Sequence, residues 1–200
     1  MKKLTVRQIT TSAVMAAIAS ILFAIPGIPI FPAVPFYKLD FSNLPVLLGS
    51  FALGPVCGTI IMVLKSLIGL LHSTSGGVGE LADFLAGAAM VIPAGFIYMK
   101  NKTRKGALLG MLIGTLCAVA AGILANQFIL FPAYGLTESA LVGLGQKMFP
   151  SISSGWQFVL MITGLFNLIK FVIISVVGYV IYKPLSPILH GRVKGSKGNA

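Results

Sequence analysis

The sequence places polar side chains inside apolar stretches, and the clearest group is a stripe near its end. Asn167 lies three residues before Lys170, and Thr163 lies seven residues before it. This spacing puts the three side chains on one face of a helix. An asparagine amide both donates and accepts hydrogen bonds, and a lysine ammonium donates them. The stripe predicts a cavity for a small molecule with a polar edge, although such groups also join neighbouring membrane helices.

A second lysine, Lys65, stands in another apolar stretch. A lysine at the centre of a membrane helix costs about 2.5–3.5 kcal/mol on insertion scales, so another group must compensate for its charge. One interpretation places Lys65 in the same site. The alternative pairs it with an internal carboxylate such as Asp83, or lets its apolar stem reach towards the membrane surface.

Catalytic motifs are absent from the sequence, which has no G-x-x-x-x-G-K-[ST] phosphate loop and no H-E-x-x-H zinc motif. His72 and His190 are expected on opposite sides of a membrane, and Cys57 and Cys117 are expected to be unpaired packing residues. We therefore expect no enzymatic activity, no metal site and no cofactor. The pattern favours a substrate-recognition subunit, a facilitator or a small channel.

The composition indicates that these residues lie in a membrane. Hydrophobic residues make up 56% of the chain and charged residues only 10%, with a mean hydropathy of +0.96. Soluble domains have about 25% charged residues. At about 20 residues per membrane helix, 200 residues have room for six spans. We predict an all-α integral membrane protein that forms a single domain over residues 1–200, without a separate soluble domain.

Proline and glycine divide the apolar sequence into helices. Pro26 and Pro132 are expected to end helices, and Gly54-Pro55 separates two of them. The link after Pro132 is expected to be polar and without a helix. The predicted transmembrane helices cover residues 5–25, 43–53, 55–72, 80–99, 106–131 and 156–182.

Charges set the predicted orientation. Lysine and arginine favour cytoplasmic loops. If the N-terminus is cytoplasmic and the chain crosses the cell membrane six times, both termini and nearly all lysines and arginines lie on the cytoplasmic side. The acidic residues Asp40, Glu80, Asp83 and Glu138 then fall at or near the outer side. The basic residues assigned to the cytoplasm are Lys2, Lys3, Arg7, Lys100, Lys102, Arg104, Lys105, Lys183, Arg192, Lys194 and Lys197.

The first outer loop has a proline at every third position from residue 26 to residue 35, which matches the period of the polyproline II helix. An extended segment is therefore predicted, and Phe36 and Tyr37 follow it. It could form a lid over an outward pocket or a stiff connector with interfacial aromatics. Trp156 is interpreted first as an interfacial anchor.

The order and spacing of several motifs resemble a known family, the substrate-binding S-components of energy-coupling-factor (ECF) vitamin transporters, and specifically their riboflavin-specific members. The similarity covers nearly the whole chain. Asn43, Asp83 and Ser66 depart from the expected pattern, which leaves room for altered vitamin specificity. The motifs that carry the resemblance are Leu39–Pro45, Gly54–Gly58, Ala82–Gly87, Asn126 with Phe131–Gly135, and Phe166–Lys170.

The resemblance implies a six-helix protein that captures riboflavin outside the cell and associates with a transmembrane scaffold and two cytoplasmic ATPases. Ala13 and Ala17 match the A-x-x-x-A motif that contacts the scaffold, and Ala16 belongs to a neighbouring row of small residues. The alternatives are an S-component that binds another vitamin or the flavin nucleotide FMN, and a membrane helix protein with no role in transport. The resemblance suggests Asn126, Asn167 and Lys170 as contacts of the flavin. The predicted substrate site also includes Asp83, Leu39, Phe36, Tyr37, Thr163 and Lys65.

Overall fold

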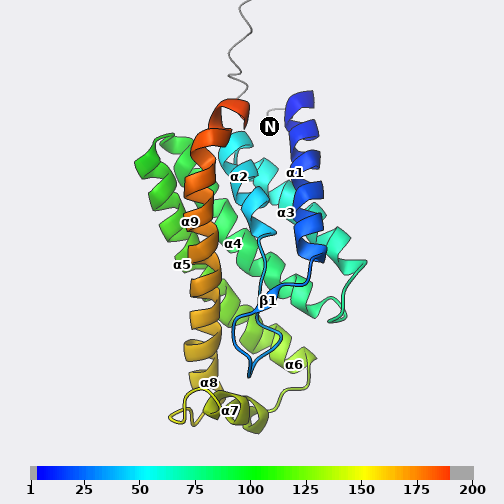
Figure 1. The fold of residues 1–200 in the computed structure, drawn as a ribbon, viewed down its shortest axis with the longest axis vertical. Helices are drawn as coiled ribbons and strands as arrows, with labels where there is room; N and C mark the ends of the chain where they lie inside the picture. Colours follow the sequence, from blue (N-terminus) through cyan, green and yellow to red (C-terminus); the bar gives the residue numbers. More distant parts are fainter. Residues whose placement is uncertain (1–3, 190–200) are drawn as a thin grey trace, which may run out of the picture.

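The chain folds into a bundle of helices that run roughly along one long axis (Figure 1). The computed structural model describes residues 4–189, with 183–189 described by their backbone alone. The main helices are α1 (Val6–Ala24), α2 (Asn43–Leu53), α3 (Pro55–Leu70), α4 (Val78–Lys100), α5 (Arg104–Ala125) and α9 (Gly164–Leu189). Shorter elements are β1 (Ile28–Pro29), β2 (Lys38–Leu39), η1 (Asn126–Leu130), α6 (Phe131–Ala133), α7 (Glu138–Gln146), α8 (Gly155–Phe158) and η2 (Val159–Thr163).

Local sequence signals account for several helix ends. The Thr5 side chain accepts a hydrogen bond from the backbone N–H of Gln8, whose side chain bonds back to Thr5, so α1 begins with a capping box. Thr103 caps α5 in the same position. Gly54 separates α2 from α3 with φ of 99°, a value that favours glycine, and Pro55 occupies the first turn of α3.

Two helices change their winding where they reach one end of the bundle. α5 continues through the π-helical turn η1 into α6, and α8 continues through the π-helical turn η2 into α9. The predicted helices 106–131 and 156–182 correspond to these composite segments. Pro132 does not stop the first of them, because it lies in the first turn of α6, where no N–H is needed.

Four helical segments are long and apolar enough to cross a membrane: Val6–Ala24, Val78–Lys100, Arg104–Ala133 and Gly155–Tyr182. α2 and α3 are shorter, at about 16 and 24 Å for a rise of 1.5 Å per residue, against a hydrocarbon thickness of about 30 Å. α2 is buried along most of its length and contacts α1, α3, α4 and α9. Protein rather than lipid therefore surrounds this short helix.

Close backbone contact joins α4 and α5. A Cβ atom added at Gly114 would lie 2.5 Å from the carbonyl oxygen of Met90, and one at Gly110 would lie 2.8 Å from that of Ala94. Glycine is therefore required at both positions of α5. Small residues at a helix interface allow such an approach where lipid is as apolar as the helices themselves.

Two predictions about the connections are wrong. The link between Pro132 and Trp156 contains a helix, α7, whose N-cap Thr137 accepts a hydrogen bond from the Ala140 N–H. The first loop is not a polyproline II segment, because it folds back on itself and pairs β1 with β2 in antiparallel fashion. Burial of Val34 and Tyr37 drives this compaction, since both side chains are removed from solvent.

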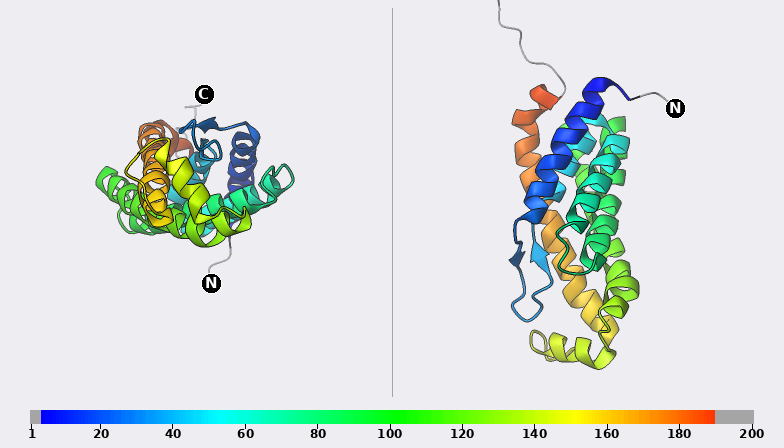
Figure 2. Two further views of the ribbon diagram at one scale, coloured as in Figure 1. Left: turned by 90° about the horizontal axis from the view of Figure 1, so that it is seen from below. Right: turned by 90° about the vertical axis from the view of Figure 1, so that its right-hand side faces the viewer.

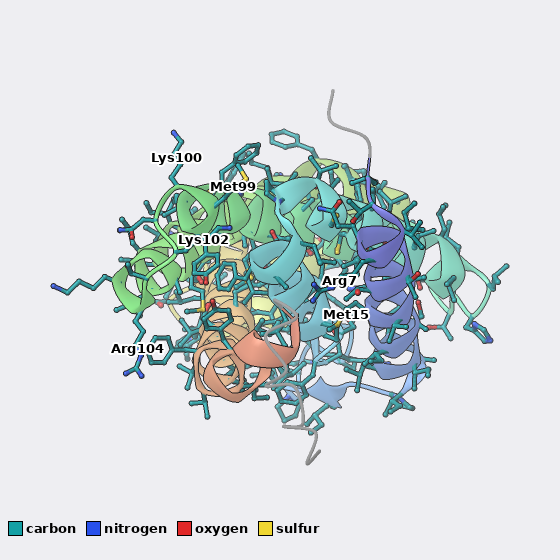
Figure 3. The ribbon with its side chains drawn as sticks, turned by 90° about the horizontal axis from the view of Figure 1, so that it is seen from above. Arg7, Met15, Met99, Lys100, Lys102 and Arg104 are labelled. Carbon is teal, nitrogen blue, oxygen red and sulfur yellow. The ribbon has the colours of Figure 1, made fainter. Side chains whose placement is uncertain are left out.

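The beginning of α1 and the end of α9 lie at the same end of the bundle (Figure 1). Arg7, Lys100, Lys102 and Arg104 gather at this end, as the view along the bundle shows (Figure 3). The acidic residues Asp40, Glu80, Asp83 and Glu138 lie in other parts of the fold. The remaining basic residues assigned above to the cytoplasm, except Lys105, lie outside the side chains that the structure describes, and so does His190.

Candidate functional site

A cavity of about 220 Å³ lies where the first loop, residues 25–42, meets α4, η1 and α9. Its wall combines aromatic rings with amides and charged groups. The residues from which the site is built are Phe36, Tyr37, Asp40, Asp83, Asn126, Phe166, Asn167 and Lys170.

Four charged residues form a cluster beside this cavity. Lys65 of α3 is fully buried, and its Nζ lies 2.6 Å from Oδ2 of Asp83 in α4. The same Nζ donates hydrogen bonds of 2.8 Å to Oδ1 of Asn43 and to Oγ of Ser42. All three donors of the ammonium therefore have acceptors. Asn43 and Asp83 are themselves joined, since Nδ2 of Asn43 donates to Oδ1 of Asp83 at 3.1 Å.

Lys170 completes the cluster from α9. Its Nζ donates to Oδ2 of Asp40 and to Oδ1 of Asp83, each at 2.8 Å. Burial is the largest influence on the pKa of Asp40 and would raise it, but the charges of Lys170 and Lys65 and the hydrogen bond from Lys170 together hold that pKa below its ordinary value. The two aspartates thus balance the two lysines. Among the described residues Lys170 uses only two of its three N–H groups, which leaves the third for a ligand in the cavity.

The two π-helical turns support the amides of the site. Asn126 begins η1, and its Nδ2 donates to the Gly122 carbonyl at 2.7 Å. Asn167 follows η2, and its Nδ2 donates to the Thr163 carbonyl at 2.9 Å. A Cβ atom at Gly122 would lie 2.6 Å from the Asn167 amide, so glycine makes room for it. π-helical turns occur often at functional sites, because they change the direction of side chains within a helix.

Aromatic rings form the apolar wall. The rings of Tyr37 and Phe166 stack with centroids 4.5 Å apart and an angle of 14°, and Phe36 packs edge-on against Tyr37. The Tyr37 hydroxyl donates to Oδ1 of Asn126 at 3.1 Å and shares a 2.5 Å hydrogen bond with Oγ1 of Thr163. Burial raises the pKa of Tyr37, so the phenol stays neutral and keeps its proton for these contacts.

The structure brings together most, but not all, of the predicted substrate-site residues. Asn126, Asn167, Lys170, Asp83, Phe36 and Tyr37 line the cavity. Thr163 contacts it only through Tyr37, and Leu39 pairs with Ile28 in the hairpin instead. Lys65 does not line the cavity either, and it forms the internal ion pair with Asp83 that the alternative interpretation predicted.

Sequence reasoning did not assign several residues of the cavity wall to the site, among them Asp40, Phe166, Phe23 and Glu80. Asp40 was considered for topology and within the motif Leu39–Pro45 but not for the site, although two buried lysines require two carboxylates and a second one had to be found. Phe166 was noted only within the motif Phe166–Lys170, and Phe23 gave no signal, since aromatic residues are common in membrane helices. Trp156 lies outside the cavity wall and is 48% exposed, as an interfacial anchor would be.

The small residues of α1 fall on two faces. Ala13 and Ala17 are exposed, whereas Ala16 is only 3% exposed and packs in the core with Ala19. Ala16 therefore packs inside this chain, whereas Ala13 and Ala17 are the residues of the predicted partner interface that lie on the surface. Ser12, one turn before it, is buried as well.

The family model described as "ECF transporter, substrate-specific component" matches residues 7–182. The chain belongs to this family. A solved S-component of a bacterial ECF transporter has the same fold, with a TM-score of 0.71 and 32% sequence identity over 91% of this chain and 96% of the other.

Curated relatives of this S-component include two riboflavin transporters. RibU of Staphylococcus aureus is 32% identical over 189 residues, which cover 92% of each chain. FmnP of Bacillus subtilis is 26% identical and covers 91% of this chain and 93% of its own. Both relatives match almost the full length of the S-component described here.

We predict that Lys65→Met destabilises the S-component without ligand, because it leaves buried oxygens of Asp83 and Asn43 without their donor. Loss of one partner of a buried ion pair costs on the order of 3 kcal/mol. Thermal unfolding in detergent measures the effect. The control is Lys147→Met, which removes an exposed lysine at the C-terminal end of α7. Equal melting temperatures for K65M and K147M would contradict a structural role for Lys65.

Proposed function

We propose that this S-component captures riboflavin in the cavity between the first loop, α4, η1 and α9. The observation that carries the proposal is the placement of two amides and one free ammonium N–H next to a stacked pair of aromatic rings. The names of the two relatives described above, both riboflavin transporters, support the same ligand.

The chemistry of the vitamin fits this arrangement. The isoalloxazine ring is a wide apolar plane with one polar edge, along which carbonyl acceptors alternate with an imide N–H donor. Asn126 and Asn167 can donate to the carbonyls, and the Oδ1 of Asn167, which accepts no hydrogen bond from the described residues, can accept from the imide. Lys170 adds a charge-assisted donor for a carbonyl. The ring plane would lie against Tyr37 and Phe166.

The proposal includes transport without chemical change to the vitamin. The chain acts as a substrate-binding subunit rather than an enzyme, carries no cofactor of its own, and takes energy from two cytoplasmic ATPases through a transmembrane scaffold. Ala13 and Ala17 are the proposed contacts with this scaffold, since small exposed residues four apart let another helix approach closely.

The proposed topology has six membrane segments in the cell membrane and both termini in the cytoplasm. The support is the common end of α1 and α9 together with the basic residues that gather there (Figures 1 and 3). Lysine and arginine near membrane helices favour the cytoplasmic side. The four long helical segments and the two short helices α2 and α3 make up the six membrane segments. The short helix α2 can lie within the membrane because neighbouring helices shield it from lipid.

The pocket is tested by its amides. We predict that protein purified from a flavin-rich host is yellow, and that Asn126→Ala or Asn167→Ala weakens riboflavin binding by roughly 5- to 150-fold, the cost of leaving a buried polar group unpaired. Quenching of flavin fluorescence measures the affinity. Asn101→Ala, at the other end of the bundle, serves as the control. A colourless protein that binds no added riboflavin would overturn the proposed function.

The scaffold contact is tested separately. Replacing Ala13 and Ala17 together with leucine should abolish uptake and co-purification of the scaffold, because the side chains keep another helix at a distance. Riboflavin binding by the isolated subunit should stay close to that of the parent, since both residues are exposed. Serine at both positions is the size-matched control. Lost vitamin binding with an intact complex would assign the two alanines to the fold instead.

The orientation is tested with single cysteines in a background where Cys57 and Cys117 are alanine. In intact cells, an impermeant thiol reagent should modify Lys38→Cys and spare Lys102→Cys; both side chains are exposed, so only the side of the membrane differs. Permeabilised cells provide the control, since both positions should then react. Modification of position 102 in intact cells would reverse the topology.

A further inference from the structure

A second cavity, of about 410 Å³, adjoins the proposed flavin site. It lies between the end of α1, the end of α3 and the first loop, on the flank where the hairpin and the α3–α4 turn come together (Figure 2). The two cavities share five wall residues: Phe23, Lys38, Asp40, Thr74 and Glu80. They are therefore neighbouring compartments of one concave region.

Size indicates why a ligand would need both compartments. Sites for small molecules usually have volumes of about 300–1,000 Å³. The first cavity, at about 220 Å³, falls below this range, although its wall suits the ring of a flavin. The part of the ligand that does not fit in the first cavity could extend into the second cavity, which lies next to it.

Glu80 stands at the boundary between the two compartments. It lies three residues before Asp83 on α4, so the two side chains share a face of the helix and differ by about 4.5 Å along its axis. Glu80 is 9% exposed. Its Oε2 accepts hydrogen bonds from Ser73 at 2.8 Å and from Ser75 at 2.6 Å.

The carboxylate of Glu80 can accept further hydrogen bonds. Among the described residues it has no ion pair, and its Oε1 accepts no hydrogen bond. Lys38 and His72 also line the second cavity, but both are exposed, so water screens their charge more strongly than that of the buried Glu80. A hydroxyl donor would satisfy Oε1, whereas an anion next to it would be repelled.

We propose that the second cavity holds the polyol tail of the bound flavin, and that Glu80 selects a tail that ends in hydroxyl groups over one that ends in a phosphate. The proposal rests on the proposed flavin-binding function. Glu80 accepts a hydrogen bond from a tail hydroxyl through Oε1. A terminal phosphate, which carries close to two negative charges near neutral pH, is disfavoured by the same carboxylate.

Three flavins test the proposal in the wild-type protein: riboflavin, its 5′-phosphate FMN, and lumiflavin, which has a methyl group in place of the polyol. Riboflavin should bind roughly tenfold or more tightly than lumiflavin, as expected for hydrogen bonds to a charged group. Riboflavin should also bind more tightly than FMN, because the Glu80 carboxylate repels the phosphate of FMN. Equal affinity for riboflavin and lumiflavin would overturn the polyol site while leaving the flavin pocket intact.

Glu80→Gln keeps the shape of the side chain and removes its charge. The affinity ratio of FMN to riboflavin should shift towards FMN by roughly tenfold, about 1.4 kcal/mol of lost repulsion, while lumiflavin binding stays unchanged. Glu138→Gln is the matched control, because Glu138 bonds to the backbone N–H of Gly155 and lies outside both cavity walls. An unchanged ratio in E80Q would overturn the role of Glu80.

Two further measurements make every outcome decisive. If E80Q does not fold, Ser75→Ala replaces it, since it releases Glu80 from one of its two serine donors and should weaken riboflavin more than lumiflavin. Equal losses for the two ligands would count against the proposal. A changed FMN ratio in Lys38→Gln but not in E80Q would assign selection to the lysine. Failure of all three flavins to bind would overturn the proposed function itself.

Discussion

The neutral cluster of Lys65, Asp83, Lys170 and Asp40 is the interaction on which the arrangement of this protein depends. It joins α3, α4, α9 and the first loop at one point, and each of its charges would be costly alone in an apolar bundle. Because every member has its partner on a different element, the cluster fixes how these elements sit relative to one another. The proposed ligand site lies directly beside it.

The cluster also explains how one lysine can serve a ligand while another cannot. Lys65 donates all three of its N–H groups to Ser42, Asn43 and Asp83. Lys170 donates to two carboxylates and has one N–H left for a ligand in the cavity. The ammonium of Lys170 is thus oriented before a ligand arrives, which reduces the ordering cost of binding. Asn43 and Asp83 also bond to each other, and together they supply an amide oxygen and a carboxylate oxygen to Lys65, while the other carboxylate oxygen of Asp83 accepts from Lys170.

The sequence predicted the helices well and the loops poorly, for a physical reason. Long apolar stretches bounded by proline and glycine leave little choice of structure in a membrane, so most helix limits agree within a few residues, although α9 runs to Leu189, seven residues beyond the predicted end. The hairpin of the first loop depends on burial of Val34 and Tyr37 against distant helices, which no local pattern records. The stripe of Asn167 and Lys170 indicated a cavity because its spacing is local. Asp40 and Glu80 reach the site only through tertiary contacts, and their roles could not be read from spacing.

The two π-helical turns, η1 and η2, have an evolutionary consequence. Each contains one residue more than an α-helical turn would, and one residue corresponds to a rotation of about 100° around the helix axis. Insertion or loss of that single residue would rotate one half of the helix against the other half. At η1, the part of the helix that carries Asn126 could thereby acquire a new set of cavity-facing side chains, while α5, which packs against α4, kept its old ones. A lineage of such proteins could diversify its ligands by single-codon insertions and deletions at these turns, without rebuilding the rest of the bundle.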